Sequence, residues 1–443
     1  MQIPENVRLI LAQFVDINGV AKGKLVPRAH WDDVVNPGAG FAGPSIEGTG
    51  LPRYGARSEF YGRADIGTAR VLPWQRDTMH VICDGFVAGE PFDGCSRQTL
   101  KRATAKLAAM GYTLNVGIEP EFFLFERDTQ GKLQIPDALD ALAKPSYDLK
   151  SLQRGRVFDC LRALDIALHE FGLDVIQIDH EDAPAQYEVN FRYADALASA
   201  DNLTRFKLAA HAIAEAHGLV YSGMPKPFAD RPGSGLHFHL SIVDKSGIAI
   251  FDKGDGTLSA MGLNAIAGLL AHAPALTAIH APTINSYKRL TASGSRSGTT
   301  WAPVEIGWGT NNRTMPARVV AGRIEWRVPD PACNIYLSLA AVIHAFIDGI
   351  ANQRTPPKPV EFDAYFGAGA GAGTVAQTHD GNPREKLPSS LMDAINALAL
   401  NAPLSHAIGE NICAQFIATK RAEIDAFNAA IHDWEWQEYA TRF

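Results

Sequence analysis

The sequence predicts a mixed fold of strands and helices, divided into a small strand-rich N-terminal unit and a larger unit. The chain has 443 residues, 46% of them hydrophobic, which is enough for a large core. From Val7 to about Asp93, short apolar runs are interrupted by glycine and proline, as is typical of short strands. Beyond this point, strand-like runs alternate with helical patterns. We therefore expect domains at residues 1–98 and 99–443.

The elements of the larger unit follow from the spacing of apolar residues. Ser96 is the expected cap of a helix over 99–109, in which Leu100, Ala103 and Leu107 recur at helical spacing. Further strands are expected at 113–118, 175–178, 219–224 and 236–243, and further helices at 157–171, 202–217, 261–272 and 337–350. A Ser, Gly and Thr rich stretch at 291–300 predicts a mobile flap.

Composition excludes several classes of function. The net charge of -7 and the pI near 6.1 give no general basic surface, so no nucleic-acid partner is expected. The five cysteines have no close pairing, which fits neither a disulfide framework nor a zinc knuckle and favours a reducing compartment. The N-terminus lacks a signal-peptide pattern, and inspection finds no apolar run that spans a bilayer. We expect a cytoplasmic protein without membrane contact.

Two short segments place metal-binding groups two residues apart inside apolar runs. Glu119 and Glu121 form one pair, and His237 and His239 form the other. If both runs are strands, each pair projects from one face of a sheet. Further acids stand at Glu181, Glu188 and Glu325. Five carboxylates and an imidazole could converge on divalent cations, which predicts a two-metal site.

Each residue has an ordinary explanation when taken alone. A single Glu-x-Glu is usually a solvated strand face, and a single histidine is more often a hydrogen-bonded core residue than a ligand. The order of the surrounding blocks favours the functional interpretation. These blocks are Glu119-Pro120-Glu121, His180-Glu181, Gln186-Tyr187-Glu188, Lys226-Pro227, the segment from Gly233 to Ser241, the segment from Asn285 to Leu290, Asn312-Arg313, the segment from Arg323 to Arg327, and the segment from Pro329 to Asn334.

In these blocks the chain resembles the glutamine synthetase superfamily, and the segment Phe14 to Gly19 extends the resemblance to the N-terminal region. The resemblance implies an α+β fold, with a β-grasp-like N-terminal domain followed by a catalytic domain built on a curved antiparallel sheet with flanking helices. It also implies a ring-shaped, dodecamer-like homo-oligomer with active sites between neighbouring subunits. In the implied reaction, ATP phosphorylates the γ-carboxylate of glutamate, and a nitrogen nucleophile displaces the phosphate.

The resemblance also assigns the metal ligands. It implies one ion held by Glu121, Glu181 and Glu188, and a second held by Glu119, His237 and Glu325. Hard oxygen ligands suit Mg²⁺ or Mn²⁺, and two or more such ions can bridge ATP phosphates and the attacking carboxylate. Five acids this close could not all ionise without cations, because like charges raise each other's pKa.

Arginines provide the positive charge of the predicted site. Arg327 lies two residues from Glu325, so both side chains face one cavity, where the guanidinium could clamp the transferring phosphoryl group. The resemblance assigns phosphate contacts to Arg313 and Arg318, the glutamate γ-carboxylate to Arg289, and the ATP nucleotide to His239 and Ser241. Gly233 would let the backbone approach the substrate closely. Any one of these arginines alone could be a surface ion pair.

The chain departs from the family at the nucleophile. Ammonia-using members carry an aspartate where this chain has Ala42, and a flap glutamate where it has Trp301. The flap from Leu290 to Pro303 contains no acid at all. A less anionic and more apolar pocket weakens ammonium capture and favours an amine that carries a hydrocarbon group. We therefore predict a small alkylamine as the nucleophile, with methylamine favoured.

Other residues could complete the amine pocket. Tyr147 matches a wall residue of the family pocket, and Glu305 or Glu47 could bind or deprotonate the amine. Two alternatives stay open: a glutamine synthetase whose ammonium site is rebuilt from Glu305 or Glu47, and a catalytically inactive structural relative. The intact set of metal ligands and arginines argues against the second alternative.

Overall fold

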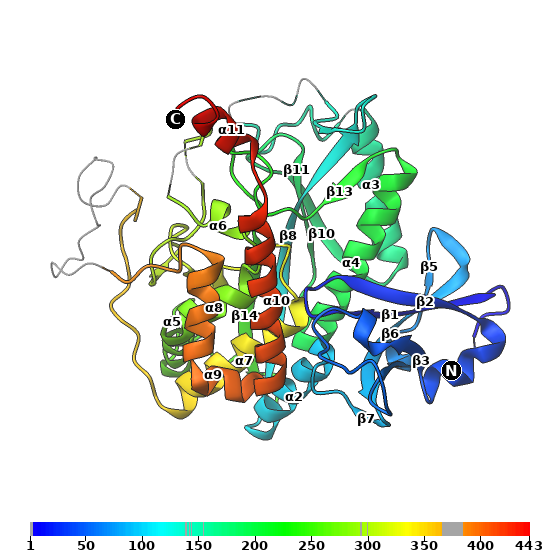
Figure 1. Cartoon of the computed structure of the whole chain (residues 1–443). Helices are drawn as coiled ribbons and strands as arrows, with labels where there is room; N and C mark the ends of the chain where they lie inside the picture. The colour runs from blue at the N-terminus through cyan, green and yellow to red at the C-terminus, as the bar shows by residue number, and fades with distance from the viewer. Residues whose placement is uncertain are drawn as a thin grey trace.

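The computed structural model of the chain contains two β-sheets, each with its own hydrophobic cluster (Figure 1). It describes residues 3–137, 140, 142, 144–153, 155–292, 295–298, 300–365 and 384–443. The smaller sheet belongs to the N-terminal region, drawn in blue, and the larger sheet lies in the rest of the chain. The two sheets, the larger of them almost wholly antiparallel, together with the helices confirm the predicted α+β fold.

The N-terminal sheet has seven strands in the order β2-β1-β6-β4-β3, with β5 and β7 also paired to β6. The strands are β1 (Leu9–Val15), β2 (Ala21–Pro27), β3 (Ala39–Ala42), β4 (Glu59–Ala64), β5 (Arg70–Leu72), β6 (Gln75–Val87) and β7 (Glu90–Pro91), with a short helix α1 (Trp31–Val35). Ile10, Phe14 and Phe60 lie in its hydrophobic cluster. The domain boundary predicted between residues 98 and 99 falls inside the next helix, α2 (Ser96–Ala109), and stays a prediction.

The larger sheet has ten strands in the order β10-β11-β8-β14-β17-β16-β15, and three short strands also pair with β8. The strands are β8 (Tyr112–Arg127), β9 (Leu133–Gln134), β10 (Val175–His180), β11 (Gln186–Phe191), β12 (Ala194–Asp195), β13 (Val220–Ser222), β14 (Leu236–Asp244), β15 (Trp308–Thr310), β16 (Ala317–Val320) and β17 (Arg323–Trp326). All pairs in it are antiparallel, as expected, except β15 with β16, which is parallel.

Successive side chains of these strands point to opposite faces. In β14, Leu236, Phe238 and Leu240 are fully buried in the main core, and the intervening His237 and His239 lie on the other face. The same alternation holds in β8, β11, β16 and β17. The apolar face therefore anchors the sheet, and the opposite face is free to carry polar chemistry.

Helices cover the apolar face of the large sheet. The helices of the larger unit are α2, α3 (Gly155–Glu170), α4 (Ala196–Ala216), α5 (Ala260–His280), α6 (Ser286–Arg289), α7 (Ile335–Ala351), α8 (Leu391–Leu400), α9 (Ala402–Ile408), α10 (Glu410–Ala429) and α11 (Asp433–Tyr439), and not all of them cover this face. Helices α2, α4 and α5 contact the sheet, and α7 packs against α2, α4 and α5. Helices α8, α9 and α10 form an outer layer, in which α10 is the long red helix of Figure 1.

Several helix ends differ from the prediction. Helix α2 begins at Ser96 itself, and the preceding Cys95 supplies no side-chain cap. Helix α4 begins earlier than expected, because the carboxylate of Asp195 accepts hydrogen bonds from the backbone N–H groups of Leu197 and Ala198. Helix α5 continues past the expected end at His272, through Pro274, to His280. Its surroundings explain the extension, since nearly every residue of its second half is buried and tertiary packing overrides the local preference.

Helix α5 is also the one described helix that is long and apolar enough to cross a membrane by length and composition, which inspection of the sequence does not anticipate. Its most apolar window is 78% buried within the protein, against α7 and α8. The apolar surface of α5 is therefore used by the core.

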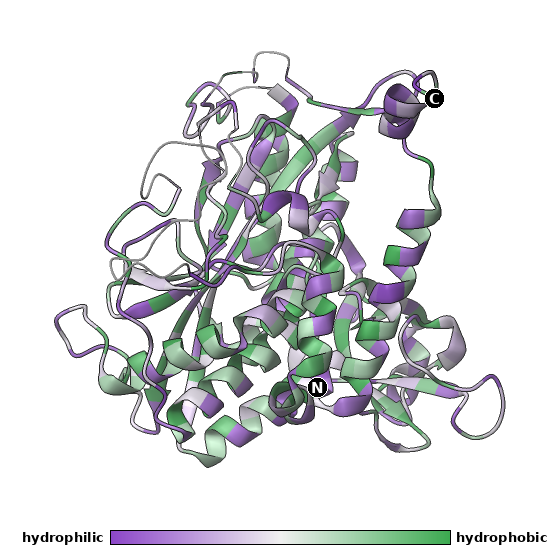
Figure 2. Ribbon diagram, turned by 60° about the vertical axis from the view of Figure 1, so that its left-hand side comes forward, coloured by the Kyte–Doolittle hydropathy of each residue, from purple (hydrophilic) through white to green (hydrophobic). Residues whose placement is uncertain are grey.

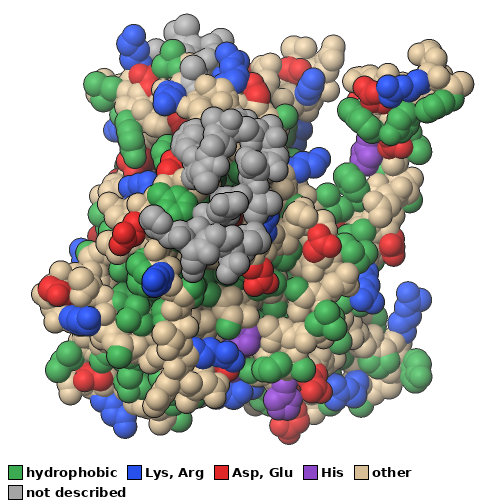
Figure 3. Space-filling model, turned by 90° about the vertical axis from the view of Figure 1, so that its left-hand side faces the viewer, with side chains coloured by type: hydrophobic (Ala, Val, Ile, Leu, Met, Phe, Trp, Pro, Cys, Tyr) green, Lys and Arg blue, Asp and Glu red, His purple; other side chains and the backbone are tan. Residues whose placement is uncertain are grey.

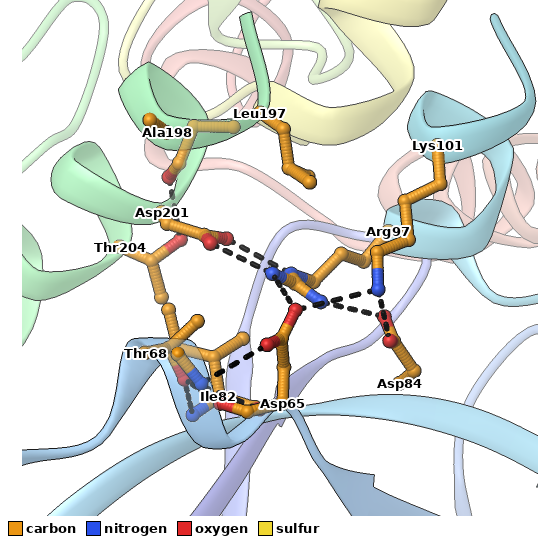
Figure 4. Close-up of polar contacts among 12 residues, drawn as sticks. Asp65, Thr68, Ile82, Asp84, Arg97, Lys101, Leu197, Ala198, Asp201 and Thr204 are labelled. Atoms are coloured by element: carbon orange, nitrogen blue, oxygen red, sulfur yellow. Dashed lines mark hydrogen bonds and ion pairs between the residues drawn. The ribbon is translucent and has the colours of Figure 1, made fainter. Parts of the chain in front are cut away.

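A buried ion-pair cluster joins the N-terminal sheet to the helices of the larger unit (Figure 4). Arg97 of α2 is 3% exposed, and its guanidinium donates hydrogen bonds to three carboxylates. Asp65 follows β4 and accepts at 2.9 Å, Asp84 of β6 accepts at 2.7 Å, and Asp201 of α4 accepts at 2.8 and 2.9 Å. One cation thus links residues of β6, α2 and α4 that are far apart in the sequence.

Replacing Arg97 by methionine should destabilise the protein strongly. Arg97→Met leaves three clustered carboxylates without their guanidinium, and removing one partner from a buried ion cluster costs about 3–5 kcal/mol. The matched control is Arg76→Met, because the Arg76 and Glu170 side chains are 69% and 43% exposed and such pairs contribute at most about 1 kcal/mol. Urea unfolding followed by circular dichroism measures the free energy of unfolding of both variants. Equal losses of stability in the two variants would contradict the stabilising role of the cluster.

The loss of unfolding free energy in Arg97→Met should also depend on pH. Burial raises the pKa of Asp65, but the charge and hydrogen bond of Arg97 outweigh it, so the pKa lies below its ordinary value of 3.8. A lowered carboxylate pKa stabilises the protein at pH values above the unfolded pKa, and this contribution disappears as the pH falls through the folded pKa. The free energies of unfolding of the wild type and of Arg97→Met should therefore approach each other as the pH falls below about 4.

Candidate active site

The polar face of the large sheet borders a cleft of about 750 Å³. Strands β8, β10, β11, β14, β16 and β17 contribute side chains to it, together with the flap and the segment before α3. The predicted site residues that line the cleft are Glu119, Glu121, Tyr147, Glu181, Glu188, Gly233, His237, His239, Arg289, Trp301, Arg313, Arg318, Glu325 and Arg327. The fold therefore brings nearly the whole predicted set together.

Strand register places one group of predicted metal ligands in contact. His237 stands directly opposite Glu119 across β14 and β8, and His239 stands opposite Glu325 across β14 and β17. Ligand atoms of Glu119, His237 and Glu325 all lie within 4.8 Å of one another. His237 Nδ1 lies 3.4 Å from Glu119 Oε2 and 3.8 Å from Glu325 Oε1. Two carboxylates and an imidazole at this spacing fit a divalent cation such as Mg²⁺ or Mn²⁺.

Glu121 is held in place by its neighbours. Its Oε2 accepts hydrogen bonds from the backbone N–H of Gly235 at 2.9 Å and from Gln186 Nε2 at 3.0 Å. Its other oxygen, Oε1, lies 3.9 Å from His237 Nε2. A Cβ atom at Gly235 would approach His237 Nε2 to 2.5 Å, so any other residue here would displace the His237 imidazole. One carboxylate oxygen is thereby fixed and the other stays available to a ligand.

The remaining predicted ligands, Glu181 and Glu188, are buried among other acids. Glu188 stands opposite Glu121 across β11 and β8. Burial raises the pKa of Glu181 to about 8, and the nearby charges of Glu121 and Asp179 add to the rise. Burial and the charges of Glu119 and Glu121 raise the pKa of Glu188 well above its ordinary value. Without cations this side of the cleft cannot carry all its negative charge, which is the chemical character expected of a metal site.

Two arginines neutralise Glu325 on the other side of the cleft. Arg327 and Arg318 each form an ion pair with one of its carboxylate oxygens. Burial raises the pKa of Glu325, but the charge of Arg327 above all, then the two cleft histidines and Arg318, lower it to about 2. Glu325 is therefore ionised across the ordinary pH range, and both guanidinium groups are fixed at the cleft wall.

Both histidines of β14 contact Glu119, and His239 also contacts Arg323. His239 accepts a hydrogen bond at Nδ1 from Arg323 Nε at 3.0 Å and lies 2.7 Å from Glu119 through Nε2. Because Nδ1 is an acceptor here, Nε2 carries the proton and donates to Glu119. Burial would raise the pKa of Glu119, but hydrogen bonds from His237 and His239 outweigh it and hold the pKa below its usual range.

Arg289 and Gly233 form another wall. The Arg289 guanidinium is buried and donates to the backbone carbonyls of Val328 at 3.0 Å and Arg327 at 3.1 Å. These neutral acceptors leave its charge uncompensated by any carboxylate contact within 4.0 Å among the described residues. A Cβ atom at Gly233 would meet the Pro225 carbonyl oxygen at 2.3 Å, so the loop requires glycine there.

The flap contributes Trp301 to the cleft. Trp301 has a φ of 55° and its side chain is 44% exposed. Its backbone carbonyl accepts a hydrogen bond from Arg327 Nη2 at 3.0 Å, and its indole Nε1 donates to Asp182 at 3.2 Å. Tyr147 lies in the same cleft and is 73% exposed. Ser293, Gly294 and Thr299 of the predicted flap lie outside the described residues.

Several residues singled out from the sequence lie elsewhere. Ser241 is on the polar face of β14 but sits farther along the strand, opposite Asn115, and is not part of the cleft wall. Glu305 is paired with Arg384 at 2.9 Å and also lies outside the wall. Ala42 and Glu47 belong to the N-terminal region and do not line this cleft.

The cleft also contains polar residues that sequence analysis missed. Gln186, Arg323, Asp179 and Asp182 all line it. Gln186 shares a strand face with Glu188 in β11, Arg323 shares one with Glu325 in β17, and Asp179 stands two residues before Glu181, so a two-residue period could have found all three. Asp182 lies on the loop between β10 and β11, and no periodic signal marks it.

Comparison with known proteins places this cleft in a family. Residues 93–439 match the model of the glutamine synthetase catalytic domain. A glutamate--methylamine ligase from Methyloversatilis universalis is 42% identical over 441 residues, which cover 99% of this chain and 97% of the relative. A glutamine synthetase from Rhizobium leguminosarum bv. phaseoli is 36% identical over 435 residues, which cover 97% of this chain and 96% of the relative.

Solved structures agree with the sequence matches. The structure named "GmaS/ADP complex-Conformation 1" superposes with a TM-score of 0.89 at 36% identity, covering 98% of this chain and 97% of that chain. The structure named "Apo GmaS without ligand" gives a TM-score of 0.88, also at 36% identity. Family membership implies ATP and a divalent metal ion in the reaction. The protein is an ATP-dependent ligase, and the chain belongs to the glutamine synthetase family.

Proposed function

We propose that this chain joins glutamate to a small alkylamine, with methylamine favoured, through a γ-glutamyl phosphate formed at the expense of ATP. The observation that supports the choice of amine is Trp301, an indole at the cleft wall in a flap whose sequence contains no acid. The similarity to a relative named for methylamine supports the same choice. Most of the other polar groups of the cleft then serve to activate glutamate.

Activation of a carboxylate needs charge neutralisation and alignment. We propose that Glu119, His237 and Glu325 hold one divalent ion, and that Glu121, Glu181 and Glu188 hold another, as Mg²⁺ or Mn²⁺. Such ions neutralise the phosphates and polarise the transferred phosphoryl group. The raised pKa values of Glu181 and Glu188 support this assignment, because crowded acids need cations to ionise together.

We assign the substrates to the arginines and the nearby loop. Arg289, whose guanidinium donates to two backbone carbonyls and forms no ion pair with a described carboxylate, would bind the γ-carboxylate of glutamate beside Gly233. Arg327 and Arg313 would contact the transferring phosphoryl group, with Arg318 and His239 on the nucleotide side and Ser241 farther along the same strand face. Fixed guanidinium groups cost no reorganisation when charge develops on the phosphate oxygens.

The amine would enter between Trp301 and Tyr147. An aromatic wall has a favourable apolar contact with a methyl group, and ammonium has no hydrocarbon surface to use it. The alternative of a rebuilt ammonium site at Glu305 gains no support, because that carboxylate is paired with Arg384 outside the cleft wall. An inactive relative has no need for crowded carboxylates facing fixed arginines.

The preferred nucleophile can be tested by competition. Phosphate release from ATP with glutamate and Mg²⁺ or Mn²⁺ is measured with ammonium, methylamine, ethylamine, ethanolamine and putrescine. Methylamine should exceed ammonium in kcat/KM by roughly 10-fold or more, the usual size of discrimination by one hydrocarbon group. Trp301→Ala should reduce this ratio, because the apolar wall is lost. A clear preference for ammonium in the wild type would overturn the alkylamine assignment.

The metal assignment predicts a specific loss. Glu325→Ala should weaken Mn²⁺ binding, measured by isothermal titration calorimetry, by at least roughly 10-fold, and should abolish turnover. Glu170→Ala is the control, because that glutamate lies in an exposed pair with Arg76 far from the cleft. Unchanged Mn²⁺ affinity in Glu325→Ala would remove this residue from the metal site, even if turnover were lost through the displaced arginines.

We also propose a ring-shaped homo-oligomer with sites between subunits. The C-terminal segment after α10 stands away from the body of the molecule (Figure 2) and carries a projecting group of hydrophobic side chains (Figure 3). Its exposed apolar residues are Ile431, Trp434, Trp436, Tyr439 and Phe443. An exposed aromatic group of this kind is typical of a surface that binds another protein.

Removal of residues 431–443 tests the contribution of this segment. The full chain should sediment as a large homo-oligomer, and the truncated chain should form smaller species, because the exposed aromatic surface is lost. The circular dichroism spectrum controls for folding of the truncated chain. A full-length chain that sediments as a monomer at micromolar concentration would contradict the oligomer, and an unchanged truncated oligomer would exclude this segment as its contact.

A further inference from the structure

One carboxylate at the edge of the cleft has no assigned role. Asp182 lies on the loop between β10 and β11, directly after Glu181. The residue is 7% exposed and belongs to the cleft wall. It is therefore an acid that is nearly buried and borders both the proposed metal ligands and the flap.

Among the described residues, the side-chain hydrogen bonds of Asp182 come from neutral donors. Oδ1 accepts a hydrogen bond from Ser146 Oγ at 2.9 Å, and Oδ2 accepts one from Trp301 Nε1 at 3.2 Å. Among the described residues, no lysine, arginine or histidine nitrogen lies within 4.0 Å of its carboxylate. These two hydrogen bonds orient the carboxylate without neutralising it.

Several other buried acids in this protein have a cationic partner, although the proposed metal ligand Glu188 has none among the described residues. Asp65, Asp84 and Asp201 share Arg97, and Glu325 is paired with two arginines. A nearly buried carboxylate without a cation is costly, so such groups are normally paired. Each oxygen of Asp182 makes one hydrogen bond and can accept another. The site therefore lacks a cation with N–H donors.

We propose that Asp182 binds the protonated amine substrate and that the Trp301 indole covers its alkyl group. This inference deepens the proposed function and rests on it for the identity of the amine. Ammonium N–H groups can donate charge-assisted hydrogen bonds to both carboxylate oxygens, and the aromatic face attracts the adjoining cation. Trp301 then acts twice, because its Nε1 also orients the acid.

This arrangement explains how an acid-free flap can serve an amine site. The negative charge is supplied by the β10–β11 loop, and the flap supplies the indole. The flap is held at this position by the hydrogen bond from Arg327 to the Trp301 carbonyl. Amine recognition is therefore joined through Trp301 to an arginine that also contacts Glu325.

The test compares a charged with an uncharged nucleophile. Asp182→Asn keeps the size of the side chain and removes its charge. It should lower kcat/KM for methylamine, a cation at neutral pH, roughly 10- to 100-fold, mainly through KM for the amine. It should change kcat/KM for hydroxylamine, which is uncharged at neutral pH, by less than about 3-fold, with Mn²⁺ affinity unchanged. Asp174→Asn, at an exposed pair with Arg192, is the matched control and should alter neither value.

A second variant, Trp301→Phe, keeps the proposal testable if Asp182→Asn does not fold. Trp301→Phe keeps an aromatic wall but loses the N–H that orients Asp182, and it should also weaken methylamine use more than hydroxylamine use. Equal losses with both nucleophiles in Asp182→Asn, or weakened Mn²⁺ binding, would overturn the proposal and make Asp182 a structural residue or a metal ligand. If the wild type prefers ammonium, the alkylamine assignment fails, but a selective loss with ammonium in Asp182→Asn would still show that Asp182 binds the nucleophile.

Discussion

The active-site cleft depends on the register between β8, β14 and β17. Pairing of Glu119 with His237 and of His239 with Glu325 fixes the polar groups, and Ile118, Phe238 and Trp326 in the same strands are buried on the opposite face. Because the period of a strand is two residues, a slip by one residue would send the carboxylates into the core and the apolar side chains into the cleft. Burial of the apolar face therefore fixes the register, and the register fixes the positions of the polar side chains on the other face.

Charge is distributed unequally over this polar face. Arg318 of β16 and Arg327, directly after β17, form ion pairs with Glu325, whereas Glu181 and Glu188 on the other side face further acids and carry raised pKa values. The cleft thus presents fixed positive charge beside a region that requires cations. This polarity suits a reaction in which phosphate oxygens must be neutralised from two sides. The Arg97 cluster performs an analogous pairing away from the site, where it joins the two sheets through α2.

The choice of nucleophile rests on fewer residues than the activation of glutamate. Sequence shows which acids are missing, at Ala42 and in the flap, but absence alone does not identify a replacement. Glu305 was a reasonable candidate by proximity to the flap in sequence, yet it pairs with Arg384. Asp182 lies 119 residues from Trp301 along the chain and contacts it directly. The amine site is thus assembled from two loops whose approach is decided by the surrounding sheet.

The sequence by itself determined the strand-borne metal blocks, the arginines two residues from them, the α+β architecture and most of the helices, because these depend on local periodicity and on short ordered blocks. Only the tertiary structure decided the rest. Helix α5 passes through Pro274 because the core surrounds it, and the edge strand β15 pairs with β16 in parallel, a direction that no local pattern announces. The partners of Arg97, Glu305 and Asp182 come from distant segments. No local pattern encodes such pairs, since burial and chain path decide which charged groups meet.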